Sequence, residues 1–393
     1  MWYSYVAMNK DAYQDFLVAH KSNWKTNSPC FVVNTGQLND TIEKIQALLS
    51  GEIVYSHKTN PHPSITDIVK KHGCGFLLSS VEESEKIING SKVSPEKLIF
   101  QSPSLCSEQY EALKALGISR FIIDSNEQLD LILSGLENMP RKPEVLVRVN
   151  TGVTISHPEL SYSTDSYLGF PIAEVMPVFK RLNELRKADK IIVGLHNHLL
   201  SQNTFLKLWK KNLAAMTDYV EKLKKEGILL DIVDFGGGYP IDYGKETPLF
   251  EEVAALIANA TGKMSEVFPA LRFIFEPGRK VVGESITLIG KVIHVKEFKK
   301  TKVAILNCSV YNSSLDTLIV DLFLPVDKIK EDNKKPLQEY ALRGSTPDSL
   351  DIFNKKVKLA ELNPGDYLAF FHAGAYSLWS DFISLKKPDH LFL

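Results

Sequence analysis

Two hydrophobic patterns alternate along the first 280 positions of the chain: short continuous apolar runs, and longer segments with helical spacing. Short runs of β-branched and aliphatic residues, such as VLVRV at 145–149 and IIVGL at 191–195, are typical of buried strands. Between such runs, apolar residues recur at spacings of three and four. The clearest case is residues 204–226, which predict an amphipathic helix that ends before Gly227. About eight strand–helix units of this kind fit between residues 37 and 280, which predicts a parallel (β/α)8 barrel.

The expected elements can be placed by residue number. Helices are expected at 10–20, 35–49, from 64 onward, 81–88, 108–116, 126–134 and 204–226. Strands are expected at 30–34, 53–55, 76–78, 97–100, 120–123, 145–149, 191–195, 230–234 and 272–275.

The pattern changes after Gly278, where helical periodicity gives way to short strands. These strands are expected at 281–295, 303–307, in the 340s, 357–359, 367–371 and 390–393. Residues 328–337 are dense in charge and close on a proline, which indicates a solvated loop. We therefore expect a barrel domain over 37–280 and a second, mostly antiparallel β domain built from 1–36 and 281–393.

Composition narrows the classes of partner. Among 393 residues, 44% are hydrophobic and 24% charged, as in ordinary globular proteins. The formal net charge of −1 provides no long-range attraction for nucleic acid or for an anionic membrane. The four cysteines are scattered without the spacing of a zinc site or a disulfide framework, so no metal is expected. No signal peptide is visible in the first residues, and no run of apolar residues is long enough for a membrane span. We therefore expect a cytoplasmic protein.

Candidate chemistry gathers where the predicted barrel strands end, which is where active sites of such barrels lie. Lys58 follows the strand at 53–55, within VYSHKTNPHP, and the prolines after it predict a turn. His196 and His198 follow the strand at 191–195. DFGGGYP at 234–240 and EPGR at 276–279 follow two more strands. Each motif alone has an ordinary explanation: a surface lysine, a core histidine, a glycine turn or a residue that caps a turn. The presence of all four motifs at strand ends nevertheless predicts a site.

Pyridoxal phosphate needs this combination of groups. A lysine amine binds the cofactor's aldehyde, and consecutive glycine N–H groups can approach a phosphate because no Cβ stands in the way. An imidazole can stack on the ring. A buried carboxylate keeps the pyridine nitrogen protonated, so that the ring accepts electrons from a substrate carbanion.

The motifs resemble those of the alanine-racemase-fold pyridoxal-phosphate decarboxylases, the family of diaminopimelate, ornithine and arginine decarboxylases. YSHKTNP, HNHLLSQ, DFGGGYP, FEPGR and HAGAYS are each similar to a motif of that family, and the resemblance runs from about Cys30 to the C-terminus. It implies an enzyme that removes the α-carboxylate of an amino acid or of an amino-acid-bearing biosynthetic intermediate.

The resemblance also implies roles for particular residues. Lys58 resembles the lysine that binds the cofactor aldehyde, His198 the histidine stacked on the ring, and Glu276 the partner of the pyridine nitrogen. Tyr376 resembles a tyrosine near the phosphate and the substrate. The residues that resemble the phosphate contacts are Ser201, Gly236, Gly237, Gly238, Gly278 and Arg279.

The family is dimeric, and each site is completed by a segment of the second subunit. This segment resembles residues 344–351 here, so the resemblance implies a head-to-tail homodimer with Asp348 as a catalytic residue in the partner's site. An exposed turn is the alternative explanation, because Gly, Ser, Pro and Asp are common turn formers.

Several positions depart from the family pattern. Pro347 stands where the family has a cysteine that helps protonate the carbanion, and Leu77 replaces an aspartate. Leu200 replaces a glycine, and Asp316 and Thr317 stand where diaminopimelate decarboxylases have an arginine–proline pair. These changes argue against diaminopimelate as the substrate and suggest a specialised enzyme. They leave two alternatives open, an amino-acid racemase of the same fold and a non-catalytic regulatory relative.

Overall fold

The computed structural model describes residues 15–154, 167–329, 336–377 and 380–393. The chain forms two compact units. The first comprises Met1–Asp40, Ile241–Glu246 and Val282–Leu393, and the second comprises Thr41–Pro240 and Thr247–Val281. The boundaries expected at residues 37 and 280 stay a prediction.

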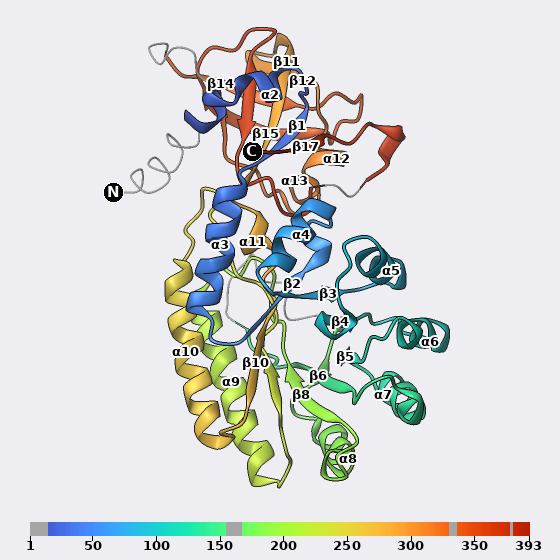
Figure 1. Cartoon of the computed structure of the whole chain (residues 1–393). Helices are drawn as coiled ribbons and strands as arrows, with labels where there is room; N and C mark the ends of the chain where they lie inside the picture. The colour runs from blue at the N-terminus through green and yellow to red at the C-terminus, as the bar shows by residue number, and fades with distance from the viewer. Residues whose placement is uncertain (1–14, 155–166, 330–335, 378–379) are drawn as a thin grey trace. The chain divides into compact units, whose positions relative to one another are not determined.

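The second unit contains a closed barrel of eight parallel strands (Figure 1). Neighbouring strands pair in sequence order, and β10 pairs with β2 to close the ring. A short strand, β7 (Phe170–Pro171), extends from β6. The predicted (β/α)8 barrel is therefore confirmed. Its strands are β2 (Glu52–Ser56), β3 (Gly75–Leu78), β4 (Leu98–Gln101), β5 (Arg120–Ile123), β6 (Glu144–Asn150), β8 (Ile192–His196), β9 (Ile232–Asp234) and β10 (Arg272–Phe275).

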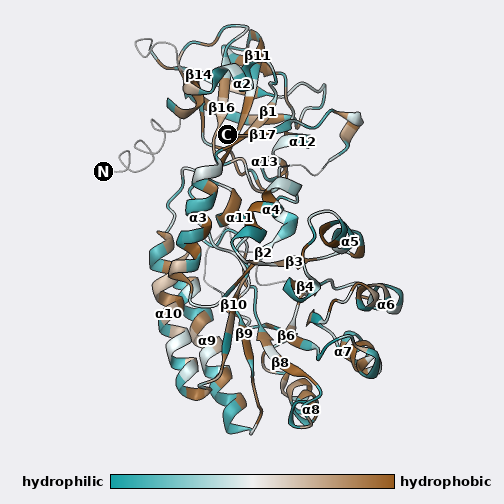
Figure 2. Cartoon of the chain, viewed as in Figure 1, coloured by the Kyte–Doolittle hydropathy of each residue, from teal (hydrophilic) through white to brown (hydrophobic). Residues whose placement is uncertain are grey.

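Helices follow the strands and carry both hydrophobic and hydrophilic residues, as expected for helices with one face on a barrel (Figure 2). Two of them begin at serines whose side chains accept a backbone N–H: Ser80 from Glu83 and Ser125 from Gln128. The helices are α3 (Thr35–Leu48), α4 (Pro63–Lys71), α5 (Val81–Asn89), α6 (Ser107–Ala115), α7 (Asn126–Ser134), α8 (Met176–Lys187), α9 (Leu206–Lys225) and α10 (Phe250–Val267). None of the described helices has both the length and the apolar character that crossing a membrane requires.

An aliphatic layer fills the barrel interior. It contains one buried residue from each of seven strands, with Ile192 of β8 packed against them. Leu77, which stands where the family has an aspartate, belongs to this layer. It is therefore a packing residue of the barrel. The seven residues are Val54, Leu77, Ile99, Ile122, Leu146, Ile232 and Ile274.

An ion-pair network joins the N-terminal ends of four barrel strands, the end opposite the predicted site. Arg120 donates to Glu52 at 2.6 and 2.8 Å and to Glu144 at 2.7 Å. Arg272 donates to the second oxygen of Glu144 at 2.8 Å. Because Arg120 and Glu144 are both buried, this network stabilises the closed ring of strands.

The first unit is a mostly antiparallel sheet, as predicted. Only the pairs β1–β17 and β12–β14 are parallel among its described strands. Short helices, α2 (Lys21–Lys25), α12 (Val310–Ser313) and α13 (Leu315–Val320), accompany it. The strands are β1 (Cys30–Val33), β11 (Ile286–Phe298), β12 (Thr301–Leu306), β13 (Val326–Lys328), β14 (Gln338–Arg343), β15 (Ile352–Leu359), β16 (Tyr367–Phe370) and β17 (Asp389–Phe392).

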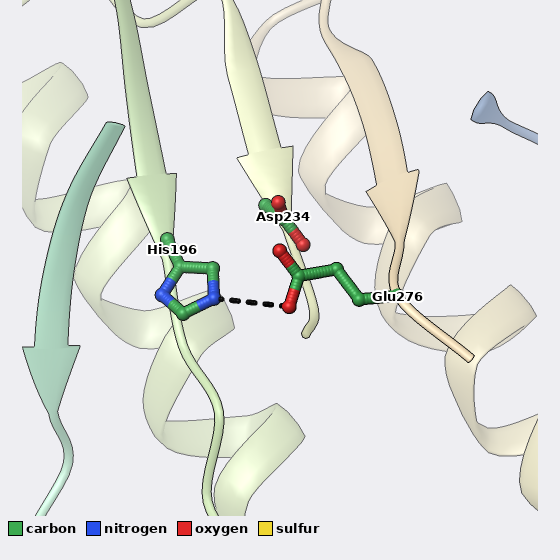
Figure 3. A group of neighbouring side chains, drawn as sticks. All are labelled: His196, Asp234 and Glu276. Atoms are coloured by element: carbon green, nitrogen blue, oxygen red, sulfur yellow. Dashed lines mark ion pairs between the residues drawn. The ribbon is translucent and has the colours of Figure 1, made fainter. Parts of the chain in front are cut away.

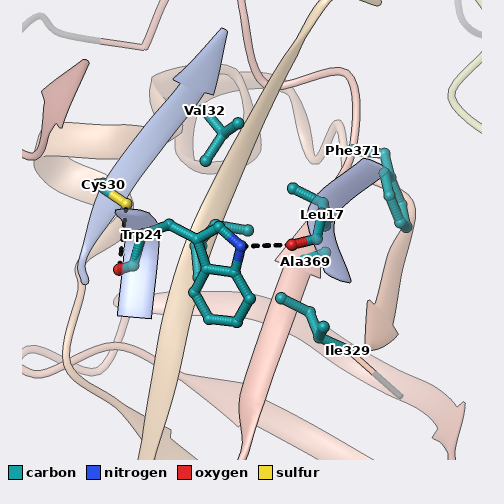
Figure 4. Close-up of a cluster of buried hydrophobic side chains, with 8 residues drawn as sticks. Leu17, Trp24, Cys30, Val32, Ile329, Ala369 and Phe371 are labelled. Atoms are coloured by element: carbon teal, nitrogen blue, oxygen red, sulfur yellow. Dashed lines mark hydrogen bonds between the residues drawn. The ribbon is translucent and has the colours of Figure 1, made fainter. Parts of the chain in front are cut away.

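Trp24 anchors a hydrophobic cluster of this unit (Figure 4). It is fully buried, and its indole N–H donates to the carbonyl of Leu17 at 2.8 Å. The cluster joins the N-terminal segment to the sheet through Val32 of β1 and Ala369 of β16.

Two elements begin at other residues than the sequence predicts, or lie partly outside the described chain. The strand predicted over 281–295 begins only at Ile286, because residues 279–282 form the short helix α11 (Arg279–Val282) and a short turn over residues 283–285 separates the two. Of the helix predicted at 10–20, residues 15–19 are helical and residues 10–14 lie outside the described part. Most of the charged loop at 328–337 also lies outside it.

Candidate active site

The candidate site is a layer of polar residues directly above the aliphatic layer of the barrel. Side chains alternate between the two faces of a strand, so the residue two positions after an inward-facing one also points inward. On β6, Arg148 thus follows Leu146, and on β9, Asp234 follows Ile232. His196 follows Gly194 on β8 in the same way, and Glu276 follows Ile274.

Lys58 lies just past β2, in the short 3-10 helix η1 (His57–Thr59). Its side chain is exposed, whereas the residues on either side, His57 and Thr59, are buried. Pro63 then occupies the first position of α4, and the His62 imidazole accepts a hydrogen bond from the Ser64 N–H at 3.2 Å. Two buried neighbours and a proline-started helix therefore hold a free amine at the end of the strand.

The two histidines after β8 differ in environment. His196 is fully buried, and burial lowers its pKa to about 4, so its ring is neutral. His198 is half-buried, and its Nδ1 accepts the N–H of Gly237 at 3.1 Å. That hydrogen bond places the ring proton on Nε2 and fixes the orientation of the imidazole.

Close backbone packing explains the three consecutive glycines. A Cβ on Gly237 would lie 2.7 Å from the carbonyl oxygen of Glu276, and one on Gly238 only 2.2 Å from that of Leu200. Gly238 also has a φ of 98°, which side chains disfavour. The Gly236 N–H donates to Asp234 at 2.8 Å and the Gly237 N–H to His198, so two of the three predicted phosphate donors are already paired within the protein.

Glu276, Asp234 and His196 form a buried cluster (Figure 3). One ligand-type atom of each lies within 4.8 Å of the others, and Nε2 of His196 is 3.5 Å from Oε2 of Glu276. Burial raises the pKa of Glu276 to about 7. Burial also raises the pKa of Asp234 well above its usual value, and the nearby charge of Glu276 adds to that effect.

Arg148 is a member of the site that the sequence analysis missed, because it lies within the apolar run VLVRV. Burial lowers the pKa of its guanidinium, while the charges of Glu276 and Asp124 oppose that shift. In turn, Arg148 favours the ionised form of Glu276. An arginine at an inward-facing position of a buried strand was the signal that could have identified it.

The second unit brings several predicted residues together. The charge of Lys58 acts on both Glu276 and His198, lowering the pKa of each. A Cβ on Gly278 would lie 2.2 Å from Oγ1 of Thr59, so the segment after β10 packs tightly beside the lysine turn. Ser201 lies in an exposed turn after β8, and Arg279 begins α11 directly after Gly278. Their predicted phosphate contacts stay predictions.

The other two predicted residues belong to the first unit, and their roles also stay predictions. The carboxylate of Asp348 accepts the N–H of Leu350 at 2.8 Å, the hydrogen bond of a local turn. Nearby, Asp351 is fully buried and accepts N–H groups from Val310 and Thr346 at 3.0 Å each. Tyr376 has a φ of 55°, an uncommon backbone conformation for a tyrosine.

The residues of the second unit fit pyridoxal phosphate. An exposed amine lies just past β2, a buried carboxyl follows the neighbouring strand β10, and an oriented imidazole follows β8. Oε1 of Glu276 is buried without a hydrogen-bond partner among the described residues, so it can accept a proton-bearing group.

Comparisons with known proteins agree with this geometry. A family model described as "Pyridoxal-dependent decarboxylase, pyridoxal binding domain" matches residues 35–283. Diaminopimelate decarboxylase of Methanocaldococcus jannaschii is 28% identical over 332 residues, which cover 83% of this chain and 74% of that protein.

Two solved structures illustrate the shared fold. The crystal structure of the M. jannaschii enzyme has a TM-score of 0.82 at 25% identity and covers 93% of this chain and 87% of that one. The lysine/ornithine decarboxylase of Vibrio vulnificus, complexed with putrescine, has a TM-score of 0.81 at 21% identity and covers 97% of this chain and 98% of that one. The chain therefore belongs to the pyridoxal-dependent decarboxylases, and it is an amino-acid decarboxylase that uses pyridoxal phosphate.

Proposed function

We propose that α-decarboxylation takes place at the C-terminal end of the barrel, with Lys58 as the covalent anchor of the cofactor. The observation that carries this proposal is the position of Lys58 just past β2, beside the strand that leads to the buried Glu276. Strands β2 and β10 pair, and the Ser56 hydroxyl donates to the backbone carbonyl of Glu276 at 3.0 Å. A nucleophilic amine and a buried carboxylate at neighbouring strand ends are what the cofactor requires.

Each residue has a distinct task in this proposal. Pyridoxal phosphate, when bound, supplies an electron sink for the charge left when CO2 departs. Glu276 would accept a hydrogen bond from the ring nitrogen, and the positive charges of Arg148 and Lys58 favour its ionised form against the effect of burial. Burial keeps His198 neutral, with a pKa of about 3, so its flat face can lie against the ring without adding charge. Phosphate binding is assigned to Ser201, Gly236, Gly237, Gly238, Gly278, Arg279 and Tyr376.

The substrate is proposed to be an amino acid, or an amino-acid-bearing intermediate, other than diaminopimelate. Asp316 and Thr317 stand in α13, where diaminopimelate decarboxylases have an arginine–proline pair. The Thr317 hydroxyl donates to the carbonyl of Leu322 at 2.8 Å, which makes it a structural residue of that turn. Neither side chain supplies a positive charge for a distal carboxylate.

The working form is proposed to be a head-to-tail homodimer in the cytoplasm. The dimer rests on the resemblance of residues 344–351 to the segment that completes the neighbouring site in the family. The location is supported by the four cysteines, all unpaired in the described chain, with Cys30, Cys74 and Cys308 buried.

Purified protein provides the test through absorbance, borohydride reduction and peptide mapping. The wild type should show a visible band that reduction removes, with the label on Lys58. Lys58→Ala should lose the reducible adduct, whereas Lys71→Ala, a change at an exposed lysine of α4, should retain it. A label on any other lysine would contradict the assignment. CO2 release from diaminopimelate, lysine, ornithine, arginine and larger amino acids then identifies the substrate.

A further inference from the structure

Asp234 is a fully buried carboxyl group to which the proposed mechanism assigns no task. Its Oδ1 accepts the N–H of Gly236 at 2.8 Å. Its Oδ2 is buried and receives no N–H or O–H group from the described residues, and the same holds for Oε1 of Glu276. A buried polar atom without a partner is costly, and here one occurs at the end of β9 and another directly after β10.

These two oxygens belong to carboxyl groups that point toward one another (Figure 3). Two ionised carboxylates so placed would repel strongly in a medium of low dielectric constant. A single proton between them removes the repulsion and gives both of these oxygens a hydrogen-bond partner.

The surrounding charges decide which carboxyl group holds the proton. Arg148 from β6 and Lys58 from the end of β2 both favour the ionised form of Glu276. Burial and the charge of Glu276 raise the pKa of Asp234. His196 and the Gly236 N–H act in the opposite direction, but the pKa stays well above its usual value. Tyr239, whose buried hydroxyl is also near the pair, keeps its proton because burial raises its pKa.

We propose that Asp234 is a neutral carboxylic acid in the working enzyme and a positioning residue that donates the proton on Oδ2 to Oε1 of Glu276. The inference rests on the proposed role of Glu276, because it explains how that carboxylate stays ionised and correctly oriented. The carbonyl oxygen of the Asp234 carboxylic acid accepts the Gly236 N–H, and its hydroxyl donates to Glu276. Both oxygens of Asp234 therefore have a partner.

This arrangement makes a distinctive prediction about substitutions. An asparagine at position 234 has a carbonyl oxygen for Gly236 and an N–H group for Glu276, so Asp234→Asn should preserve both hydrogen bonds. Asp234→Ala removes the donor and leaves a space beside Glu276. If Asp234 acts instead as an anion, for example as a metal ligand with His196 and Glu276, both substitutions should be equally harmful.

The first measurement is infrared spectroscopy of wild-type protein with 13C-labelled aspartate. A protonated aspartic acid band is expected at neutral pH, with and without cofactor, and it should be absent from Asp234→Asn. Because this band does not require bound cofactor, it tests the shared proton even if the proposed function fails. The proposal would be overturned if the wild-type spectrum lacks this band, or if elemental analysis finds a stoichiometric metal ion.

The second measurement compares the two variants as holoenzymes. Asp234→Asn should keep kcat within about 10-fold of wild type, whereas Asp234→Ala should lose about 100-fold, as expected when a reacting group is misplaced. KM and the visible cofactor spectrum should change little in Asp234→Asn. Equal losses in both variants would contradict the positioning role.

Discussion

Nδ1 of His57 lies 2.7 Å from Oε1 of Glu83, so the residue directly before Lys58 is joined to the first turn of α5. The other ring nitrogen lies 3.0 Å from the Thr66 hydroxyl of α4. Both contacts are mostly buried. The turn that carries the amine is therefore fixed to the two helices that follow β2 and β3.

Glu83→Ala should destabilise the protein and loosen this turn. The Glu83 carboxylate also accepts the N–H of Ser79 at 2.9 Å, so the variant leaves the buried His57 ring and the half-buried Ser79 N–H without their acceptor. We expect a loss of about 1–3 kcal/mol in the free energy of unfolding, measured by urea titration. The exposed Glu85 of the same helix is the matched control, and equal effects of Glu83→Ala and Glu85→Ala would show that the His57 contact contributes nothing.

Glu276→Gln should retain the cofactor but slow turnover. The amide cannot hold a proton on the ring nitrogen by a charge-assisted hydrogen bond, so the electron sink is weakened. A decrease in kcat of about 100- to 1,000-fold is expected, with the reducible adduct on Lys58 preserved. Turnover like that of the wild type would remove Glu276 from the mechanism.

Acid should weaken the ion-pair network at the other end of the barrel. Burial alone would raise the pKa of Glu144, but Arg120 and Arg272 hold it below its usual value. Its stabilising contribution is thus present above the pKa of the unfolded chain, near 4.5, and is lost as pH falls through the lower folded pKa.

Glu144→Gln should remove this contribution. We expect a loss of about 3 kcal/mol in the free energy of unfolding near neutral pH and a weaker pH dependence in the acid range, measured by urea titration at several pH values. The control is Glu96→Gln, which breaks only the half-exposed pair with Arg141 and should cost less than about 1 kcal/mol. An unchanged acid dependence in Glu144→Gln would assign the acid sensitivity to other groups.

Mixing two inactive variants should test the homodimer and the proposed place of Asp348. If each site combines Lys58 of one subunit with Asp348 of the other, a heterodimer of Lys58→Ala and Asp348→Ala has one intact site. Random subunit exchange should then restore about a quarter of wild-type activity. Without recovery despite proven exchange, either both residues serve the same chain's site or Asp348 takes no part in the chemistry.

The order of strands and helices could be predicted because each element carries its own local pattern. The strands expected at 120–123 and 272–275 and the helix at 126–134 have the predicted bounds. The family, the cofactor and the decarboxylase activity were also predicted correctly, because lysine, histidine, glycine and glutamate motifs stand next to strand ends.

Only the tertiary structure decided which of these residues meet inside the barrel. Arg148 looked like part of an apolar strand, and Asp234 like the start of a glycine turn. Their importance comes from strand alternation and register, which place residues from separate strands in one buried layer above Leu146 and Ile232. The pairing of Asp234 with Glu276 is a contact between β9 and the end of β10. Its effect on their protonation arises from burial, a property that neither residue has in the unfolded chain.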